Sequence, residues 1–159
     1  YEIGSGLVGS EMCIRDSYYI PHIVKKVEGR DSLDRRFYER HYTKVDPKHF
    51  EPIVDGMWRG VNVGGTSTAA RLEGLDVCGK TGTAENPRGR DHSTFLSFAP
   101  KDNPKIAISV YVENGGFGAS AALPIASLLE EYYLTDTIRR PVLLDYVRNM
   151  TINYPAYDR

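Results

Sequence analysis

Three short β-type segments follow one another in the second half of the chain, and they restrict the possible fold more than any other feature. They cover roughly Leu75–Gly82, Ser93–Pro100 and Lys105–Glu113. Consecutive strands this close in the sequence are expected to pair antiparallel, with Pro100–Pro104 as the turn between the last two. The third segment is apolar at nearly every position, which is typical of a strand covered on both faces. We therefore predict a central or well-covered position for it.

Helical patterns lie on both sides of these segments. Before them, apolar side chains recur at three- and four-residue spacings, in the order Phe50, Ile53, Val54, Met57, Trp58 and Val61. Asp46 and Pro47 are typical of a helix start, and the pair Gly64-Gly65 is typical of a helix end. After the strands, Ser120–Leu134 predicts a strongly apolar helix, and Pro141–Met150 predicts a weaker one.

These elements predict an α/β fold of the α+β sandwich type. A three-stranded antiparallel sheet is expected between a helix around Phe50–Val61 and another around Ala121–Leu134. Trp58 belongs to the apolar stripe and is interpreted as a core residue rather than a ligand. An exposed sheet edge and uncovered apolar surface predict marginal stability or aggregation of the chain on its own.

The region before the first helix is less regular. Ile20–Val27 is β-branched and apolar and predicts a short strand, which Pro21 limits to an edge or a lead-in. Glu28–Asp46 carries charges of both signs and predicts a solvent-exposed connection without chemistry of its own.

Composition excludes several function classes. The chain has 159 residues, 41% of them hydrophobic, and a formal net charge of -1, which gives no electrostatic basis for binding nucleic acid. No apolar run approaches the roughly 18 to 20 residues that a membrane-spanning helix requires. Cys13 and Cys78 are too few for a disulfide framework and lack the spacing of zinc ligands. We expect no metal, no cofactor and no obligatory disulfide.

The most informative run for function is Lys80-Thr81-Gly82-Thr83. A lysine, two hydroxyl groups and a glycine together can neutralise a carboxylate, pass a proton and let a substrate backbone approach closely. These are requirements of anion binding and acyl transfer. The four residues alone are also typical of an ordinary exposed turn, so the flanking segments decide between the two interpretations.

The flanks follow the motif in a characteristic order: Asp91–Pro100, then Lys105–Asn114, then Gly115–Ser120 opening a helix. This order resembles the end of the transpeptidase domain of class B penicillin-binding proteins of the elongation type, over about 120 residues from Tyr18 to Leu134. The resemblance implies a serine acyltransferase that cross-links the D-Ala-D-Ala stem peptides of peptidoglycan and is trapped by β-lactams. It also implies a membrane glycosyltransferase as partner of the full-length protein, at the periplasmic face of the bacterial inner membrane.

The same resemblance implies roles within the motif. Lys80 contributes positive field and helps a proton relay. Thr81 and Thr83 offer hydroxyl groups to the terminal carboxylate of the substrate, and the Thr83 backbone N–H is one oxyanion donor. Gly82 leaves the strand face open where the substrate lies alongside as an added strand. Lys80 and Thr83 are the predicted catalytic residues, and the run from Lys80 to Thr83 is the predicted substrate-binding segment.

The chain carries no nucleophile of this family. No serine is followed by lysine three residues later, and no Ser-x-Asn triplet occurs. We therefore expect this chain alone to be inactive. Two alternatives to a transpeptidase remain: a penicillin-recognising hydrolase or sensor of the same fold, and a non-catalytic interaction module that retains one motif.

Two further candidates receive structural interpretations. Histidine is a common general base and His92 follows Asp91, but adjacent residues on a strand point to opposite faces. We expect a structural hydrogen bond for His92 rather than a general-base role. Gly115–Gly118 lacks the Gly-Lys-Ser/Thr ending of a phosphate-binding loop and predicts a tight strand-to-helix turn.

The first residues differ in character from the rest. Residues 7–17 resemble a translated sequencing-adapter read-through and show no sustained hydrophobic period. The expected organisation is a non-native, poorly packed tail at 1–17, followed at 18–159 by the C-terminal part of a penicillin-binding transpeptidase domain that lacks the nucleophile motif.

Overall fold

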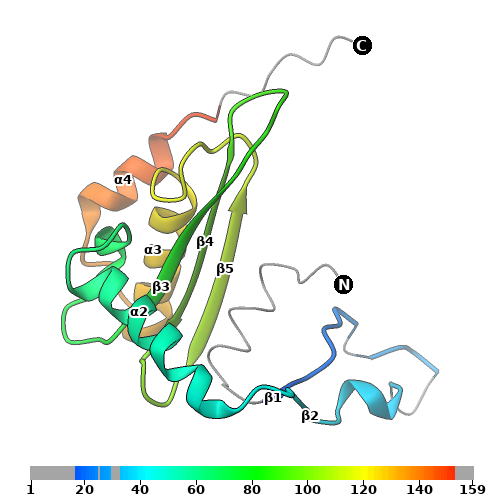
Figure 1. The fold of residues 1–159 in the computed structure, drawn as a ribbon. Helices are drawn as coiled ribbons and strands as arrows, with labels where there is room; N and C mark the ends of the chain where they lie inside the picture. Colours follow the sequence, from blue (N-terminus) through cyan, green and yellow to red (C-terminus); the bar gives the residue numbers. More distant parts are fainter. Residues whose placement is uncertain (1–16, 25, 30–32, 153–159) are drawn as a thin grey trace.

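A computed structural model describes residues 17–24, 26–29 and 33–152, and within them an antiparallel sheet packs with α-helices (Figure 1). In chain order the main elements are β1 (Ser17–Tyr18), β2 (His41–Tyr42), α2 (Glu51–Asn62), β3 (Cys78–Ala84), β4 (His92–Ala99), β5 (Ile106–Val112), α3 (Ala122–Thr135) and α4 (Pro141–Asn149). Short 3-10 helices lie at Arg35–Phe37, Pro47–His49 and Thr68–Ala70. The predicted α+β class with an antiparallel sheet is confirmed.

The strand order of the main sheet is β3-β4-β5, and both pairs are antiparallel. Among the described residues β4 is therefore the central strand and β5 lies at the edge, covered at alternate positions, so the prediction of a central or well-covered third strand is wrong. Only alternate side chains of β5 face the helix layer, while Ala107, Ser109 and Tyr111 on its other face are exposed. A nearly continuous apolar run hid this alternation, because alanine and tyrosine are tolerated on an exposed sheet face.

One face of the sheet is covered by α3. Phe95 and Ala99 of β4 are buried in one cluster with Leu123 and Ala126 of α3. Full burial of a side chain as large as Phe95 or Leu123 contributes about 1.5 to 3 kcal/mol. Pro124 lies in the first turn of α3, where the missing N–H leaves no helical bond unmade. The predicted second helix is thus confirmed, together with its place against the sheet.

The first half of β3 is covered by α2. Val54 and Met57 of α2 form a buried cluster with Cys78 and Phe98. Val61, one turn further along, belongs instead to the cluster on the α3 side of the sheet. Since Cys78 and Phe95 lie on opposite faces of the sheet, α2 reaches around the edge at β3.

The predicted start of this first helix is confirmed in outline. The Asp46 carboxylate accepts the Lys48 N–H at 3.1 Å, and Pro47 occupies the first helical position. The opening turn is a 3-10 helix, however, and the α-helix begins at Glu51. The chain leaves the helix at Asn62, two residues before Gly64, whose φ of 104° requires glycine.

The predicted strand over Ile20–Val27 is wrong for its described residues. The two-residue strand of this region is β1, which pairs with β2 through Ser17 and Tyr42. Ile23 and Val24 are exposed, and β-branched residues form a strand only where a neighbouring strand pairs with them. Figure 1 shows this region to one side of the main sheet. Residues 1–16, which hold nearly all of the predicted tail, lie outside the described residues.

Solvent-exposed apolar side chains lie on the last two helices. The largest are Leu129, Tyr132, Tyr133, Val142 and Tyr146. They are consistent with the expected uncovered surface, while the predicted marginal stability stays a prediction. In the described part of the chain no helix is long and apolar enough to cross a membrane.

Candidate active site

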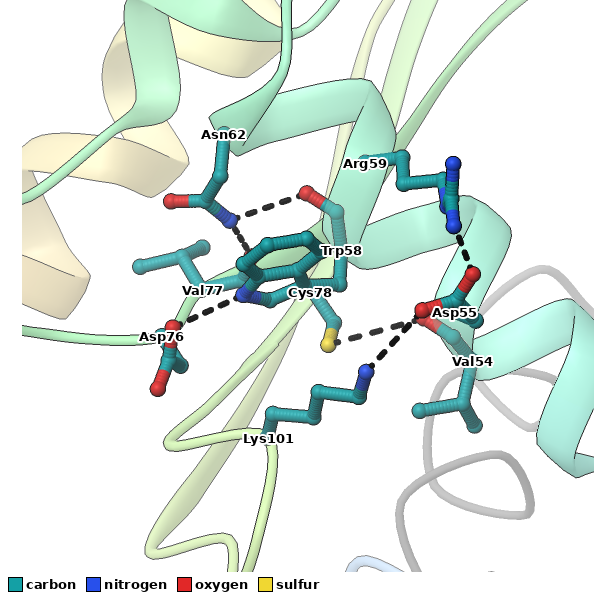
Figure 2. Close-up of polar contacts among 9 residues, drawn as sticks. All are labelled: Val54, Asp55, Trp58, Arg59, Asn62, Asp76, Val77, Cys78 and Lys101. Atoms are coloured by element: carbon teal, nitrogen blue, oxygen red, sulfur yellow. Dashed lines mark hydrogen bonds and ion pairs between the residues drawn. The ribbon is translucent and has the colours of Figure 1, made fainter.

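The run Lys80–Thr83 lies within β3, and the residues just before it are firmly held (Figure 2). Trp58 of α2 donates its indole N–H to Asp76 Oδ1 at 2.8 Å. Asn62 donates its amide N–H groups to the carbonyl oxygens of Trp58 and Val77, both at 2.9 Å. These bonds tie α2 to the entry of β3. We call residues Asp76–Gly79, which are the two residues before β3 and its first two, the anchored end.

Lys101, in the turn between β4 and β5, contacts Asp55 and lies in the lower part of Figure 2. Its ammonium lies 3.2 Å from Asp55 Oδ1 and 5.0 Å from the centre of the Trp58 ring. Its backbone N–H donates to the Asp76 carbonyl at 2.7 Å. Trp58 is thus a structural residue, as predicted, and the turn after β4 is fixed to the entry of β3.

The charges around Asp55 favour its ionised form. Hydrogen bonds from Arg59 and Lys101 lower the pKa of the Asp55 carboxyl, and Arg59 Nε lies 2.6 Å from Asp55 Oδ2. The Arg59 and Asp55 side chains are both substantially exposed, so water screens their attraction. This ion pair lies within α2 and contributes little to the stability of the fold.

The second half of β3, residues 80–84, has much looser surroundings, and we call it the open end. The Lys80 side chain is exposed, and its ammonium donates to the Thr81 carbonyl. Lys80 and Gly82 lie on one face of the strand, and Thr81 and Thr83 lie on the other. Because β3 is an edge strand among the described residues, its outer backbone groups do not pair with another strand there.

The two threonine hydroxyl groups of the motif have polar neighbours outside it. Thr81 Oγ1 lies 3.1 Å from Thr66 Oγ1, and either can be the donor. Thr83 Oγ1 accepts the Gly118 N–H at 3.4 Å. The structure therefore places all four predicted site residues on one accessible strand segment, with both hydroxyl groups on the same side.

Gly82 has a structural reason to be glycine. A Cβ at this position would lie 2.3 Å from Thr94 Oγ1 on the paired strand. The space beside Gly82 is therefore taken by Thr94 rather than left open, which differs from the expected open face. A bulkier residue would be obstructed, as predicted, but by the sheet itself.

His92 makes the structural hydrogen bond that the sequence predicts. Its Nδ1 accepts the Asn114 N–H at 3.0 Å, and its ring packs on Tyr111 with 5.4 Å between centres. Asp91 instead accepts the Asn86 N–H at 3.2 Å, so it does not orient the imidazole. The Asp91–His92 pair therefore has no arrangement for general-base catalysis.

The glycine run after β5 forms the predicted turn into α3. Gly116 has a φ of 78°, and its N–H donates to the Asp91 carbonyl at 2.8 Å.

No group of three or more histidine, cysteine, aspartate or glutamate side chains in the described residues could hold a metal ion. The motif itself offers one ammonium and two hydroxyl groups on an accessible strand.

Sequence reasoning missed two residues that support this segment. Thr66 contacts the Thr81 hydroxyl from the loop after α2, and Ser93 of β4 bonds the loop that covers Thr83. Hydroxyl residues occur throughout the chain, and neither position has a local pattern that distinguishes it. The antiparallel register pairs Ser93 with Thr83, and knowledge of that register would have been needed to predict the role of Ser93.

Comparison of this chain with known proteins identifies its family. The family described as the penicillin binding protein transpeptidase domain matches residues 14–129. That is well over half of the chain, so this chain belongs to the penicillin binding protein transpeptidase family.

Individual relatives agree with this assignment. The chain is 34% identical over 138 residues to the peptidoglycan D,D-transpeptidase MrdA of Haemophilus influenzae, covering 74% of this chain and 21% of that protein. It is 29% identical over 147 residues to MrdA of Acinetobacter baumannii, covering 79% of this chain and again 21% of that protein. The chain thus spans about a fifth of the length of these curated relatives.

Solved structures show the same fold. Penicillin-binding protein 2 of Pseudomonas aeruginosa, in complex with WCK 5153, superposes with a TM-score of 0.63 at 28% identity, covering 82% of this chain and 29% of that one. Penicillin-binding protein A of Mycobacterium tuberculosis, as an imipenem acyl-enzyme complex, gives a TM-score of 0.57 at 25% identity, covering 77% and 28%. The predicted family and fold are therefore confirmed.

Proposed function

We propose that this chain is the C-terminal part of a peptidoglycan D,D-transpeptidase that cross-links the cell wall during elongation. The arrangement of the open end supports this most directly: the hydroxyl groups of Thr81 and Thr83 lie on one side of an edge strand, and the exposed ammonium of Lys80 directly precedes them in sequence. A peptide ending in a carboxylate can pair with such a strand edge while the hydroxyl groups bind its charge.

Each motif residue has a role in this proposal. Lys80 supplies positive field and takes part in proton transfer with a serine that this chain does not contain. Thr81 and Thr83 bind the terminal carboxylate of the stem peptide or of a β-lactam. The Thr83 N–H is one oxyanion donor. The chain alone is expected to be inactive, because acyl transfer requires the nucleophile of a Ser-x-x-Lys motif.

The wider setting is also a proposal. We place residues 18–159 in the transpeptidase domain and regard 1–17 as foreign to it. The full-length protein is proposed to act at the periplasmic face of the inner membrane with a membrane glycosyltransferase. Genomic DNA upstream of the Tyr18 codon provides a check: the proposal requires Ser-x-x-Lys and Ser-x-Asn in the same reading frame.

A hybrid enzyme tests the activity. Residues 18–135 of this chain replace the aligned segment of Haemophilus influenzae MrdA, and acylation by a fluorescent penicillin is measured on denaturing gels. We expect the hybrid to be labelled and the 159-residue chain alone to remain unlabelled.

Matched valine variants identify the contribution of the hydroxyl groups. Thr81→Val and Thr83→Val should each slow acylation of the hybrid about tenfold or more, since each removes a hydrogen bond to a charged group. Thr43→Val makes the same change at a threonine outside the motif, whose hydroxyl donates to the Val45 carbonyl, and should leave the rate nearly unaltered. A hybrid that melts cooperatively but is never labelled would contradict the proposal.

A further inference from the structure

Ser93 has an unusual set of contacts for a strand residue. It is fully buried in β4, where it pairs with Thr83 on one side and Val112 on the other. Its hydroxyl lies 2.9 Å from the Phe117 carbonyl and 3.2 Å from the Gly118 carbonyl, to which it can donate, and it accepts the Ala122 N–H at 2.9 Å. One side chain therefore holds the middle of the connection between β5 and α3 and the first residue of α3.

The bond to Ala122 replaces a missing helix cap. Ala122 is the first residue of α3, and the cap residue Ala121 has no side chain that could accept a hydrogen bond. The first N–H groups of a helix have no partner within the helix. Ser93 provides one from the neighbouring strand, so the start of α3 is fixed to the sheet at the residue opposite Thr83.

The turn held by Ser93 lies directly on the motif strand. A Cβ on Gly118 would be 2.5 Å from the Gly82 carbonyl oxygen, 2.7 Å from the Thr94 carbonyl oxygen and 2.9 Å from the Gly82 nitrogen. Only glycine allows the backbone to approach so closely. In this position the Gly118 N–H reaches the Thr83 hydroxyl.

This contact determines what the Thr83 hydroxyl can do. A threonine hydroxyl has one donor hydrogen and two acceptor lone pairs. The Gly118 N–H occupies a lone pair and leaves the hydrogen available for a carboxylate. It also restricts rotation of an exposed side chain that could otherwise occupy other staggered rotamers.

We infer that Ser93 is a positioning residue for the carboxylate site: by fixing the turn at residues 117–122, it orients the hydroxyl of Thr83 toward the substrate. The structural part of this inference stands on the contacts alone. Its consequence for substrate binding rests on the proposed function.

The matched control is Ser97, four residues along the same strand and on the same face. It is also fully buried, but its hydroxyl has no hydrogen-bond partner among the described residues. Ser93→Ala and Ser97→Ala thus remove the same atom from similar surroundings. Ser93 differs from its control in the hydrogen bonds to the turn.

Nuclear magnetic resonance of the 159-residue chain tests the structural part. In Ser93→Ala, the Gly118 and Ala122 amides should exchange with solvent about tenfold faster, the factor that one hydrogen bond of ordinary strength represents. Three-bond couplings of Thr83 should change from those of a single χ1 rotamer to averaged values. Ser97→Ala should leave both measurements unchanged. Thr83 couplings that are identical in Ser93→Ala and the parent chain would overturn the inference.

The hybrid enzyme separates the functional consequence from the structural one. Acylation rates are compared for benzylpenicillin and for its methyl ester, which lacks the charged carboxylate. Ser93→Ala should reduce the acid-to-ester ratio severalfold, whereas a general loss of stability would lower both rates together. An unchanged ratio in a labelled hybrid contradicts the positioning role. A hybrid that is never labelled contradicts the proposed function and leaves the coupling measurement to decide on Ser93.

Discussion

The two halves of β3 differ sharply in how they are held. At the anchored end, Trp58, Asn62 and Lys101 bind the backbone and side chains around Asp76 from two separate elements. At the open end, Lys80 is exposed and bonds only to its sequence neighbour among the described contacts. The same short strand thus combines a fixed entry with an accessible motif.

This difference shows how an accessible site can still be well positioned. A β-strand rises about 3.3 Å per residue, so fixing the entry of β3 also limits where the next four residues lie. The groups proposed to act on substrate need few bonds of their own. Substitutions at the anchored end should therefore change stability, and substitutions at the open end should change function.

The largest expected effect on stability comes from a buried carboxyl group in α3. Glu130 of α3 is fully buried, and its carboxyl oxygens make no hydrogen bond among the described residues. Burial raises the pKa of Glu130 to about 8, against smaller lowering effects of Ser97 and Arg140. Ser97 is close enough to lower this pKa, although its hydroxyl does not reach hydrogen-bond geometry.

The sign of the pH dependence follows from the raised pKa. The folded state holds a proton that the unfolded state releases near pH 4.5, so the stabilising contribution is complete below 4.5 and is lost as the pH rises to about 8. The loss could approach about 5 kcal/mol. Urea unfolding between pH 4 and 9 measures it. Glu130→Gln should flatten this slope; an equally steep slope in the variant would show that other groups cause it.

Trp58→Ala is the next largest change and removes the centre of the anchored end. We expect a loss of about 2 to 4 kcal/mol in the free energy of unfolding, less than for a completely buried tryptophan. Trp58→Phe retains the ring but not the N–H and should cost only about 1 kcal/mol. Denaturant titrations of both variants check this. Equal costs would mean that the hydrogen bond to Asp76 dominates, rather than packing.

Two glycines of β3 give a sharper test, since each is replaced by alanine. A Cβ on Gly79 would lie 2.6 Å from the ring of Phe95, within the core. A Cβ on Gly82 would meet only the hydroxyl end of Thr94, which can rotate away. Gly79→Ala should cost about 1 to 3 kcal/mol and Gly82→Ala clearly less. Thermal melts that reverse this order would contradict the distinction between a tightly packed anchored end and a loosely packed open end.

The sequence was sufficient for elements with a strong local pattern. The apolar stripe from Phe50 to Val61 predicted α2, and the three β-type segments predicted the main sheet. The same reasoning placed β5 at the centre and assigned a strand to Ile20–Val27. In both cases the deciding factor was the neighbouring strand, which hydrophobic periodicity does not specify.

The motif of the candidate site could be predicted from the sequence, but the residues that hold the motif strand in place could not. Lys80–Thr83 formed a recognisable run with characteristic flanks. Asp76 and Trp58 are 18 positions apart, and Ser93 and Gly118 are 25 apart, so their contacts depend on the completed fold. Nothing in the local sequence indicated that Glu130 would be buried with no hydrogen bond to its carboxyl oxygens from the described residues.

The smallest expected effect concerns the exposed charges on α2. The pKa of Asp55 is lowered by hydrogen bonds from Arg59 and Lys101, so its stabilising contribution is present above its unfolded pKa of 3.8 and is lost as the pH falls below it. Asp55→Asn should remove this acid sensitivity with little change at neutral pH. Melting temperatures at pH 7 and pH 3 test this. A large drop in melting temperature at pH 7 would mean that the contacts of Asp55 with Arg59 and Lys101 stabilise the fold more than their exposure suggests.

Lys80→Ala in the hybrid enzyme is the decisive variant, because it changes only the open end. We expect an unchanged melting temperature and acylation by fluorescent penicillin that is slower by about 100-fold or more, the lower range for loss of a group that transfers protons. Lys105→Ala, which removes another exposed lysine, should alter neither. Undiminished acylation of a folded Lys80→Ala hybrid would contradict the account.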